Sequence, residues 1–415
     1  MAFIHDVFWI CVGIIFYSYF GYGILLLIIT RFKHLIINLL NSRKVEKTSK
    51  EDACPEVTLL VAAYNEEDII EAKIENTLLL SYPPDKLNIL FITDGSDDKT
   101  SEIIRRYPQI QILHQPARKG KTAALNRAMS YVTTPITIFC DANTLLNKSA
   151  IRKIVSHYHD ERTGGVAGEK KILTRKDSEA SGISEGLYWR YESLLKQLDA
   201  QLYTVIGAAG ELFSIRTALW EDLPEKIILD DFVISIRINL KGYRIAYEPA
   251  AYASELPSAS INEEKKRKVR ISAGAFQAMV HLVELFNFYK HPVIFFQFFS
   301  HRFLRWTLTP LCFPILLITN ALIAALDQSI IFKITLFAQL LSYGLAVAGA
   351  YSGSNRGLMK IAKTCHYILF MNISVYLGFI RFVQGTQTAL WDKAQRSAAH
   401  PPSLATPTVQ KYRKL

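Results

Sequence analysis

Four long apolar stretches, separated by one long polar segment, limit what this chain can fold into. The first covers Phe3–Ile29, and the others lie near Leu308–Leu326, Ile330–Tyr351 and Tyr367–Val383. Each is close to the roughly 20 residues that a helix needs to cross a bilayer. The polar segment, roughly Arg43–His291, carries charges and turn signals throughout. We therefore expect a membrane anchor, a large polar domain and about three C-terminal membrane helices.

The composition agrees with this division. Of the 415 residues 50% are hydrophobic, too many for an ordinary soluble domain, yet 20% are charged, too many for membrane helices alone. We expect an anchor at 1–42, a domain at 43–285, an interfacial helix with C-terminal membrane helices at 286–397, and a polar tail at 398–415. The interfacial helix is expected over Phe286–Phe299, where aromatic residues alternate with polar ones. The five cysteines show no CxxC spacing, so neither a disulfide framework nor a zinc site is expected.

The formal net charge of +11 arises largely from basic clusters beside the apolar stretches. One cluster follows the first stretch and the other precedes the second: Arg31, Lys33, Arg43, Lys44, Lys47 and Lys50, then Lys265, Lys266, Arg267, Lys268 and Arg270. Basic residues beside a span stay on the cytosolic side. We therefore expect an integral protein of the plasma or inner membrane, with a cytoplasmic domain and with membrane lipids as partners. Nucleic acid is not expected, because nothing resembles a nucleic-acid-binding module. Three C-terminal spans would place the basic tail outside, so the C-terminal topology stays open.

The polar domain opens with strands and helices in alternation. Short runs rich in strand formers cover 56–63, 87–93, 110–113 and 136–139, and helical patterns follow the first three. This alternation predicts an α/β domain with a parallel sheet covered on both faces. In such sheets ligands bind beyond the carboxyl ends of the strands, where this sequence has its polar motifs. The second half is less regular, with a helix expected over Glu185–Asp199 and a strand over Tyr243–Tyr247.

The polar residues at these strand ends suit a sugar nucleotide. Such a ligand needs carboxylates for the nucleoside, a cation for the diphosphate and a general base for the acceptor hydroxyl. Asp94, Lys121, Asp141 and Asp231 supply these groups in order along the chain. Each alone has a plainer explanation, because aspartates often cap helices and a lysine can stand in a solvated turn. Their joint order favours a ligand site.

Six motifs follow one another in this segment. They are Ala63-Tyr64-Asn65-Glu66-Glu67, Asp94-Gly95-Ser96 with Asp98 and Thr100, Lys119-Gly120-Lys121 with Ala124-Leu125-Asn126, Asp141-Ala142-Asn143, Gly207-Ala208-Ala209-Gly210 with Arg216, and Leu229-Asp230-Asp231. In this order they resemble the motifs of membrane-bound family 2 glycosyltransferases, over roughly Pro55–Trp306. The nearest branch is that of cellulose, hyaluronan and poly-N-acetylglucosamine synthases. The resemblance implies a GT-A fold, which is a Rossmann-like nucleotide-diphospho-sugar transferase domain, with flanking transmembrane helices.

The resemblance also implies a role for each matched residue. The residues expected at the donor are Ala63, Tyr64, Glu66, Asp94, Lys121, Asp141 and Arg270; those at a Mg²⁺ or Mn²⁺ ion are Asp141 and Asn143; those on the acceptor side are Gly207 and Gly210. Asp231 would be the catalytic base, with Asp230 as the next candidate. Two adjacent carboxylates push their pKa values apart, which suits one of them for base work. The alternative is that one of them only caps a helix.

Two positions depart from the family pattern. The second aspartate of the DxD motif is Asn143, whose neutral oxygen is a weaker ligand for a divalent ion. The glutamine and tryptophan of the QxxRW motif of polymerising synthases are missing around Arg270. Arg305-Trp306 follows later, at the edge of the membrane, either as a substitute or as an interfacial anchor. This departure leaves open whether one sugar or many are added.

The resemblance implies an inverting hexosyl- or N-acetylhexosaminyl-transferase. It would move a sugar from a UDP-sugar to a growing glycan at the cytosolic membrane face, in surface or extracellular polysaccharide synthesis. The expected partners are the nucleotide-sugar donor, a glycan or lipid-linked acceptor, and secretion subunits. One alternative is a transferase that adds a single sugar to a lipid carrier or short acceptor. Another is a non-catalytic membrane subunit, which the intact charged motifs disfavour.

Overall fold

The computed structural model describes residues 1–40, 54–173, 180–258, 260–327, 329–351 and 357–390. One mixed sheet of eight strands forms the centre of the polar domain, in the order β3-β2-β1-β4-β7-β6-β8-β5. The strands are β1 (Val57–Ala63), β2 (Leu87–Asp94), β3 (Gln111–Gln115), β4 (Ile136–Asp141), β5 (Leu145–Leu146), β6 (Thr163–Ile172), β7 (Leu212–Arg216) and β8 (Arg244–Glu255). The predicted basic residues Arg43, Lys44, Lys47 and Lys50 and the tail at 398–415 lie outside the described ranges.

The first half of the sheet agrees with the prediction and the second half corrects it. Strands β1 to β4 are parallel and begin and end within two residues of the predicted runs. Strand β7, however, runs antiparallel to both β4 and β6, so the sheet is mixed rather than purely parallel. Strand β8 continues to Glu255, eight residues past the predicted Tyr247, because it pairs along nearly the whole length of β6.

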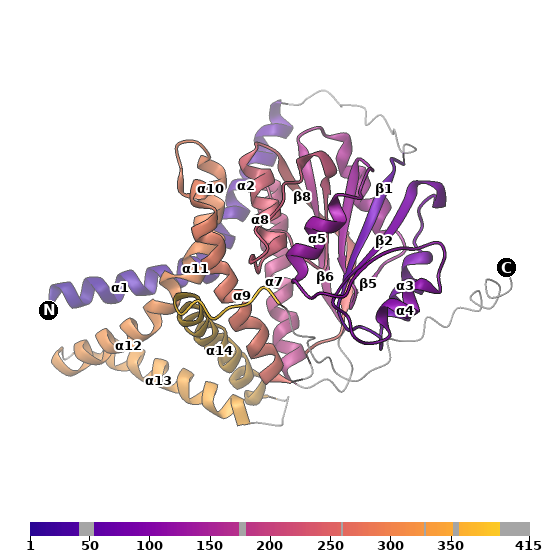
Figure 1. The fold of residues 1–415 in the computed structure, drawn as a ribbon. Coiled ribbons are helices and arrows are strands. Elements are labelled where there is room, and N and C mark those ends of the chain that lie inside the picture. The colour runs from indigo at the N-terminus through magenta and orange to yellow at the C-terminus, as the bar shows by residue number, and fades with distance from the viewer. Residues whose placement is uncertain (41–53, 174–179, 259, 328, 352–356, 391–415) are drawn as a thin grey trace.

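Helices cover both faces of the sheet (Figure 1). They are α3 (Ile70–Leu78), α4 (Thr100–Arg105), α5 (Lys121–Met129), α6 (Ala150–Val155), α7 (Ala180–Leu202), α8 (Asp230–Leu240) and α9 (Ile261–His281). Strand β1 is buried along its whole length, and its alternate side chains serve the two faces. Leu60 belongs to the core that includes Phe232 of α8, whereas Leu59 belongs to the core that includes Ile74 of α3. This alternation is what the pleat of a strand dictates.

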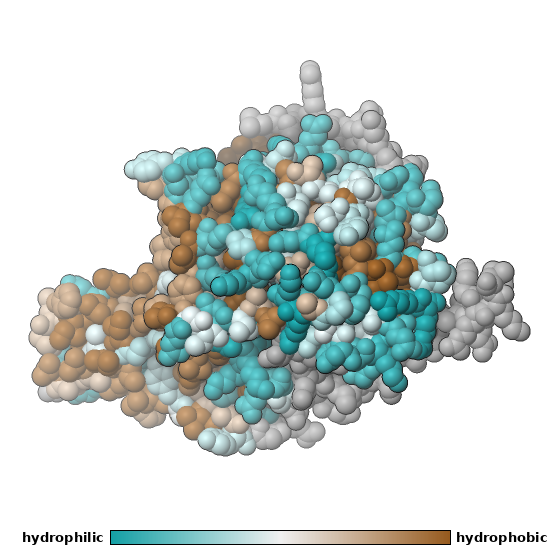
Figure 2. Space-filling view, viewed as in Figure 1, coloured by the Kyte–Doolittle hydropathy of each residue, from teal (hydrophilic) through white to brown (hydrophobic). Residues whose placement is uncertain are grey.

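Apolar helices project from one side of the domain. The remaining long helices are α1 (Ala2–Phe16), α2 (Tyr22–Leu40), α12 (Leu308–Leu326), α13 (Ile330–Tyr351) and α14 (Leu358–Val383). By length and composition four segments could cross a membrane, of which the first, Ala2–Leu39, joins α1 and α2 through a π-helical turn at Tyr17–Gly21. Helices α1, α12 and α13 extend away from the sheet, and their part of the surface is largely hydrophobic (Figures 1 and 2). Helix α2 instead packs on α7 through Tyr22 and Leu26.

The predicted interfacial helix begins later than expected. Residues Val283–Phe286 form a single 3₁₀ turn, and α10 covers only Pro292–Phe298. Proline suits the first turn of a helix, because it has no N–H group to leave unsatisfied there. A π-helical turn at Phe299–Phe303 and α11 (Leu304–Trp306) then connect α10 to α12. The prediction of one helix over Phe286–Phe299 is therefore wrong at its start.

Candidate active site

A cavity of about 650 Å³ opens at the carboxyl end of β4, between α7, α8, α9 and α14. It brings together most of the predicted site residues: Tyr64, Glu66, Lys121, Asp141, Asn143, Gly207, Gly210, Asp230, Asp231 and Arg270. The other two, Ala63 and Asp94, are buried beside the cavity and are not among the residues that line it. Motifs from both halves of the chain thus meet at the edge of the sheet where α/β folds bind ligands.

Lys121 links two of the acidic motifs. It is the first residue of α5, and its Nζ lies 2.8 Å from Oδ1 of Asp141 and 3.6 Å from Oδ2 of Asp230. Burial opposes the positive charge, but the two carboxylates outweigh burial and raise the pKa of Lys121. Burial also raises the pKa of Asp141, and Lys121 offsets part of that rise. The lysine therefore remains charged and holds β4 and α8 together across the floor of the cavity.

Of the aspartates Asp141, Asp230 and Asp231, only Asp231 forms no ion pair with Lys121 within the described residues. Its Oδ1 accepts a hydrogen bond of 2.8 Å from the N–H of Phe232, at the start of α8. Burial and the adjacent Asp230 raise the pKa of Asp231 to about 7. A carboxyl group with such a pKa can take up a proton near neutral pH, as general base catalysis requires.

Asn143 presents an oxygen that has no partner. Its Oδ1 atom is buried, accepts no hydrogen bond from the described residues, and belongs to a residue that lines the cavity beside Asp141. Buried polar atoms almost always have partners, so an orphaned acceptor at this position fits a bound cation or ligand. Within the described ranges no group of three or more His, Cys, Asp or Glu side chains could hold a metal. Mg²⁺-type sites often take only one or two protein ligands and complete the shell with phosphates and water.

Of the residues expected around the nucleoside, Tyr64 lines the cavity, whereas Asp94 is buried beside it. Tyr64 lines the cavity, and the guanidinium of Arg118 lies over its ring, 3.9 Å from the ring centroid. Asp94 is wholly buried, and its two carboxylate oxygens accept hydrogen bonds from the N–H groups of Lys119 (2.9 Å) and Gly120 (2.6 Å). Asp94 thus holds the backbone turn that precedes Lys121, and its contact with a nucleoside stays a prediction.

The glycine loop lies against the start of α8. Gly207 has a φ of +85°, and a β-carbon there would come within 2.5 Å of the Phe232 ring. A β-carbon on Gly210 would lie 3.3 Å from both Oδ2 of Asp231 and Nζ of Lys121. Glycine therefore lets the backbone approach the carboxylate closely. The ring of Trp306 meets Phe232 edge to face at 5.3 Å and lines the cavity, and the role of Arg305-Trp306 as a substitute for the missing motif stays a prediction.

The sequence did not predict a contribution from the segment after α14. Gln387, Thr388 and Leu390 line the cavity, and the carbonyl oxygen of Ala389 lies 3.1 Å from the position of a β-carbon on Gly120. This segment crosses from the end of α14 to the turn before Lys121 (Figure 1). Nothing in its composition marks it as part of a site, so only the fold reveals it.

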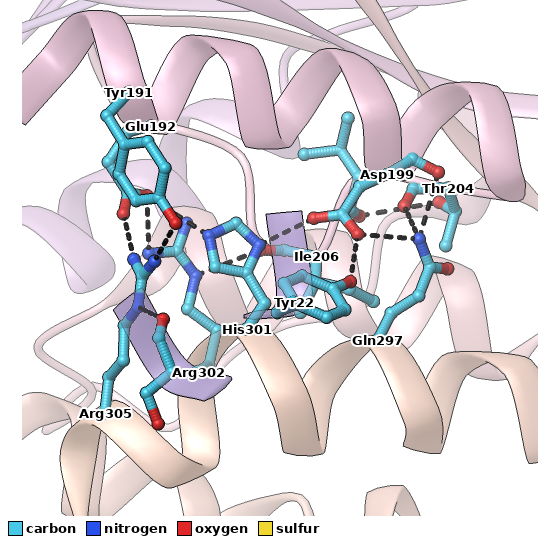
Figure 3. A network of polar contacts seen from close by, with 12 residues as sticks. Tyr22, Tyr191, Glu192, Asp199, Thr204, Ile206, Gln297, His301, Arg302 and Arg305 are labelled. Carbon is cyan, nitrogen blue, oxygen red and sulfur yellow. Dashed lines mark hydrogen bonds and ion pairs between the residues drawn. The ribbon is translucent and has the colours of Figure 1, made fainter. Parts of the chain in front are cut away.

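A buried polar network, also missed, joins α2, α7 and the α10–α11 region (Figure 3). Asp199 accepts a hydrogen bond from Tyr22 and lies 2.6 Å from Nδ1 of His301. His301 Nε2 lies 3.3 Å from Oε2 of Glu192. Glu192 also pairs with Arg302 at 3.1 Å and with Arg305 at 2.5 Å. Its partners are about 110 residues away in the sequence, so no local pattern could have indicated them.

Known proteins resemble this chain in sequence and in fold. The family model described as Glycosyl transferase family 2 matches residues 58–218. The poly-beta-1,6-N-acetyl-D-glucosamine synthase of Staphylococcus aureus (strain MSSA476) is 28% identical over 235 residues, which are 54% of this chain and 55% of that protein. The probable glycosyltransferase YdaM of Bacillus subtilis (strain 168) is 26% identical over 292 residues, or 66% of this chain and 68% of the relative. The match thus spans about half the length of the staphylococcal relative.

One solved structure resembles this chain over nearly its whole length. The mannosyltransferase PcManGT from Pyrobaculum calidifontis, determined in complex with GDP-Man and Mn²⁺, covers 92% of this chain with 100% of its own length. The TM-score is 0.65 and the sequence identity is 19%. With the family match, this similarity confirms the predicted fold class, a GT-A domain accompanied by candidate membrane helices.

Proposed function

We propose that the chain, whose residues 58–218 match the family model described as Glycosyl transferase family 2, is an inverting glycosyltransferase that uses a UDP-sugar. It transfers the sugar to a growing surface or extracellular glycan at the cytosolic face of the membrane. The staphylococcal relatives carry the name of a poly-N-acetylglucosamine synthase, so an N-acetylhexosamine is the first donor sugar to test.

The observation that carries this proposal is the position of Asp231. Its carboxylate faces the glycine loop, its pKa is raised to about 7, and its neighbour Asp230 is engaged by Lys121. In the proposed reaction Asp231 accepts the proton of the acceptor hydroxyl while that oxygen attacks the anomeric carbon of the donor. A single in-line displacement inverts the configuration, so an α-linked donor gives a β-linked product.

The leaving diphosphate needs compensation for its charge. Lys121 lies between the acidic motifs with its charge retained, and Arg270 lines the same cavity from α9. Asp141 and the orphaned Oδ1 of Asn143 are the residues that would hold a divalent cation beside the diphosphate. Such an ion, when bound, supplies Lewis-acid stabilisation of the departing phosphate oxygens. The PcManGT complex contains Mn²⁺, which makes Mn²⁺ the first ion to try.

Product analysis with the purified full-length chain tests the proposal. The enzyme is incubated with radiolabelled UDP- and GDP-sugars, Mn²⁺ and a membrane extract, and the labelled products are separated by size. We expect label from a UDP-N-acetylhexosamine in a polymer. Label confined to a single-sugar product would favour transfer to a lipid carrier or short acceptor. Absence of both transfer and nucleotide-sugar hydrolysis for every donor would favour the non-catalytic subunit.

A further inference from the structure

Helix α14 lies along the cavity for more than half of its length. Tyr367 and Arg381 both line the cavity, as do the buried Asn372 and Ser374 between them. At 1.5 Å per residue, Tyr367 and Arg381 are about 21 Å apart along the helix. The part of α14 before them, residues 358–366, is about 13 Å long, less than half of the roughly 30 Å of hydrocarbon that a crossing helix spans. The helix therefore has too few residues outside the cavity wall to cross a bilayer.

The chain returns to the polar domain directly after α14. Gln387 and Thr388 line the same cavity, and the carbonyl oxygen of Ala389 lies 3.1 Å from the position of a β-carbon on Gly120. Gly120 immediately precedes Lys121 at the start of α5. The end of α14 therefore lies on the same side of any membrane as the sheet.

A charged helix, α9, packs beside α14 (Figure 1). A β-carbon on Gly378 of α14 would clash with Ser272, and the rings of Phe276 and Phe379 meet edge to face at 5.1 Å. The earlier turns of α9 are charged at every position from 263 to 270 except Val269. Charged side chains are costly inside a bilayer. Helix α9, and the part of α14 beside it, therefore belong to the aqueous side of the membrane interface.

The surface that α14 exposes is apolar. Apart from Lys360 and the cavity-lining Ile368, its exposed residues are Leu358, Ile361, Ile373, Phe379, Ile380 and Val383. This face continues from a candidate span, because α13 packs on the start of α14 so closely that a β-carbon on Gly349 would clash with the carbonyl oxygen of Ala362. An apolar outer face on a helix whose inner side is polar is typical of helices that lie in a membrane interface.

We propose that α14 lies in the plane of the membrane, on the side of the polar domain, and does not cross it. Its apolar face rests against lipid at the boundary between headgroups and acyl chains, and Lys360 meets anionic headgroups. The partner of this face is thus the lipid leaflet next to the domain. The inference goes beyond the proposed function and shares with it only the membrane setting.

This arrangement accounts for the charge of the C-terminal tail. Of the four candidate spans, only Ala2–Leu39, α12 and α13 then cross, so the chain after α13 stays on the side of the domain. The sequence beyond residue 390 is rich in basic residues, namely Lys393, Arg396, Lys411, Arg413 and Lys414. Basic segments stay on the cytosolic side. A fourth crossing would instead place the basic tail on the side opposite the domain.

The depth of α14 in reconstituted vesicles tests the proposal. A fluorescent amino acid replaces Ile361, Ile373 or Ile380 in the full-length chain, because all three are exposed and none lines the cavity. The vesicles consist of phosphatidylethanolamine and phosphatidylglycerol, and a fraction of the lipid is brominated at a chosen acyl position. Quenching by each brominated lipid gives the depth of the label, with circular dichroism as the check on folding.

We expect the three labels on α14 to lie at one shallow depth, equal within about 5 Å, because a helix in the interface is buried evenly along its length. The matched control places the same label at exposed positions of α13, namely Ile331, Leu340 and Val347. There the middle label should lie about 10 Å deeper than the outer two, because depth changes by 1.5 Å per residue along a crossing helix. A middle label on α14 that is deeper by a similar amount would overturn the inference.

The side on which the tail lies gives a second readout. One epitope is inserted after Asp327, between α12 and α13, and the same epitope is placed after Leu415 in a second chain. In sealed spheroplasts an antibody should reach the first epitope at once and the second only after permeabilisation, because three crossings leave the tail with the domain. Access to both epitopes in sealed spheroplasts would mean that α14 crosses.

The control on α13 separates failure of this inference from failure of the proposed function. If lipid quenches the labels on α13 but none on α14, protein rather than lipid covers the apolar face, and only the inference is wrong. If lipid quenches neither helix, the membrane setting itself is wrong, and with it that part of the proposed function.

Discussion

Oδ2 of Asp230 lies 3.6 Å from the ammonium of Lys121, whereas the neighbouring Asp231 directs its carboxylate at the glycine loop. The two adjacent aspartates therefore stand in different surroundings although both begin α8. Asp230 serves the ion pair that joins α8 to β4 through Asp141, and Asp231 keeps a carboxylate available in the cavity. This division is the reason for proposing the second aspartate of the pair as the base.

The Asp231→Asn variant should lose transfer and keep UDP binding. Asparagine preserves the shape and can still accept the hydrogen bond from the N–H of Phe232, but it cannot accept a proton. Loss of a general base costs about 10²–10⁴ in rate. Transfer rate and UDP affinity of the purified variant check this, with circular dichroism as the control for folding. Retention of more than about a tenth of the wild-type turnover, well short of that loss, would remove Asp231 from the base role.

The pH dependence of the rate should follow the ionisation of Asp231. Because the pKa of Asp231 is raised to about 7, the base is protonated and inactive below this pH and free above it. The kcat/KM for the donor should therefore rise as pH increases through about 7 and then level off. The measurement is kcat/KM from acid to mildly alkaline pH, at constant ionic strength and saturating Mn²⁺. A rate independent of pH in this window would contradict the assignment.

Removal of divalent cations should stop turnover. Lys121 is already paired with Asp141 and Asp230, so its charge alone cannot neutralise a leaving diphosphate. Excess chelator should abolish transfer, and added Mn²⁺ should restore it. The Asn143→Asp variant should need less Mn²⁺ for half-maximal activity, because a carboxylate is a stronger ligand than an amide oxygen. Full turnover of the wild type in chelator would refute the metal requirement.

The Arg270→Ala change should lower turnover more than stability. Arg270 lines the cavity from α9, and we propose that it contacts the diphosphate there. Lys265→Ala is the matched control, because Lys265 stands on the same basic helix but is exposed. We expect a fall in kcat of at least about tenfold for Arg270→Ala, the effect of one lost charge-assisted hydrogen bond, and a melting temperature close to wild type. If activity were normal in detergent and lost only in anionic bilayers, Arg270 would instead serve lipid headgroups.

The Gly207→Ala variant should displace Asp231, the proposed base, by pushing on the neighbouring Phe232. A β-carbon there would meet the Phe232 ring at 2.5 Å, and the φ of +85° already disfavours alanine by about 1–2 kcal/mol. Gly242→Ala isolates the second effect, because Gly242 has a φ of +90° and open space around its β-carbon position. Both variants should lose stability in thermal melts, and only Gly207→Ala should also lose most of its activity. Equal activity in the two variants would exclude this positioning role.

The sequence alone predicts those elements that follow from local patterns of apolar and polar residues. Strands β1 to β4 were predicted almost to the residue, because each is a short apolar run that ends at a polar motif. The resemblance to family 2 glycosyltransferases is confirmed by the family match, and the four predicted apolar stretches correspond to four candidate spans. Tyr64 and Asp141 meet in one cavity because the parallel strands β1 and β4 end at one edge of the sheet.

The remaining features depend on contacts between distant segments. Strand β6 reads Thr-Gly-Gly-Val-Ala-Gly-Glu-Lys-Lys-Ile, a glycine-rich and charged run with no strand alternation, and it is ordered by pairing with β7 and β8. Glu192 belongs to an unremarkable polar face of α7, and its partners Arg302 and Arg305 come from a distant segment of the chain. Neither fact follows from spacing along the chain, because tertiary packing decides both.

Because α14 and the residues after it form part of the cavity wall, removal of the candidate membrane helices would also remove part of the cavity. Gln387 and Thr388 face the cavity, and Ala389 rests on Gly120. A fragment ending after α9 would keep every acidic motif and still present an open groove to water. Expression of the polar domain alone should therefore give an incompetent fragment, because it also loses core residues such as Phe298.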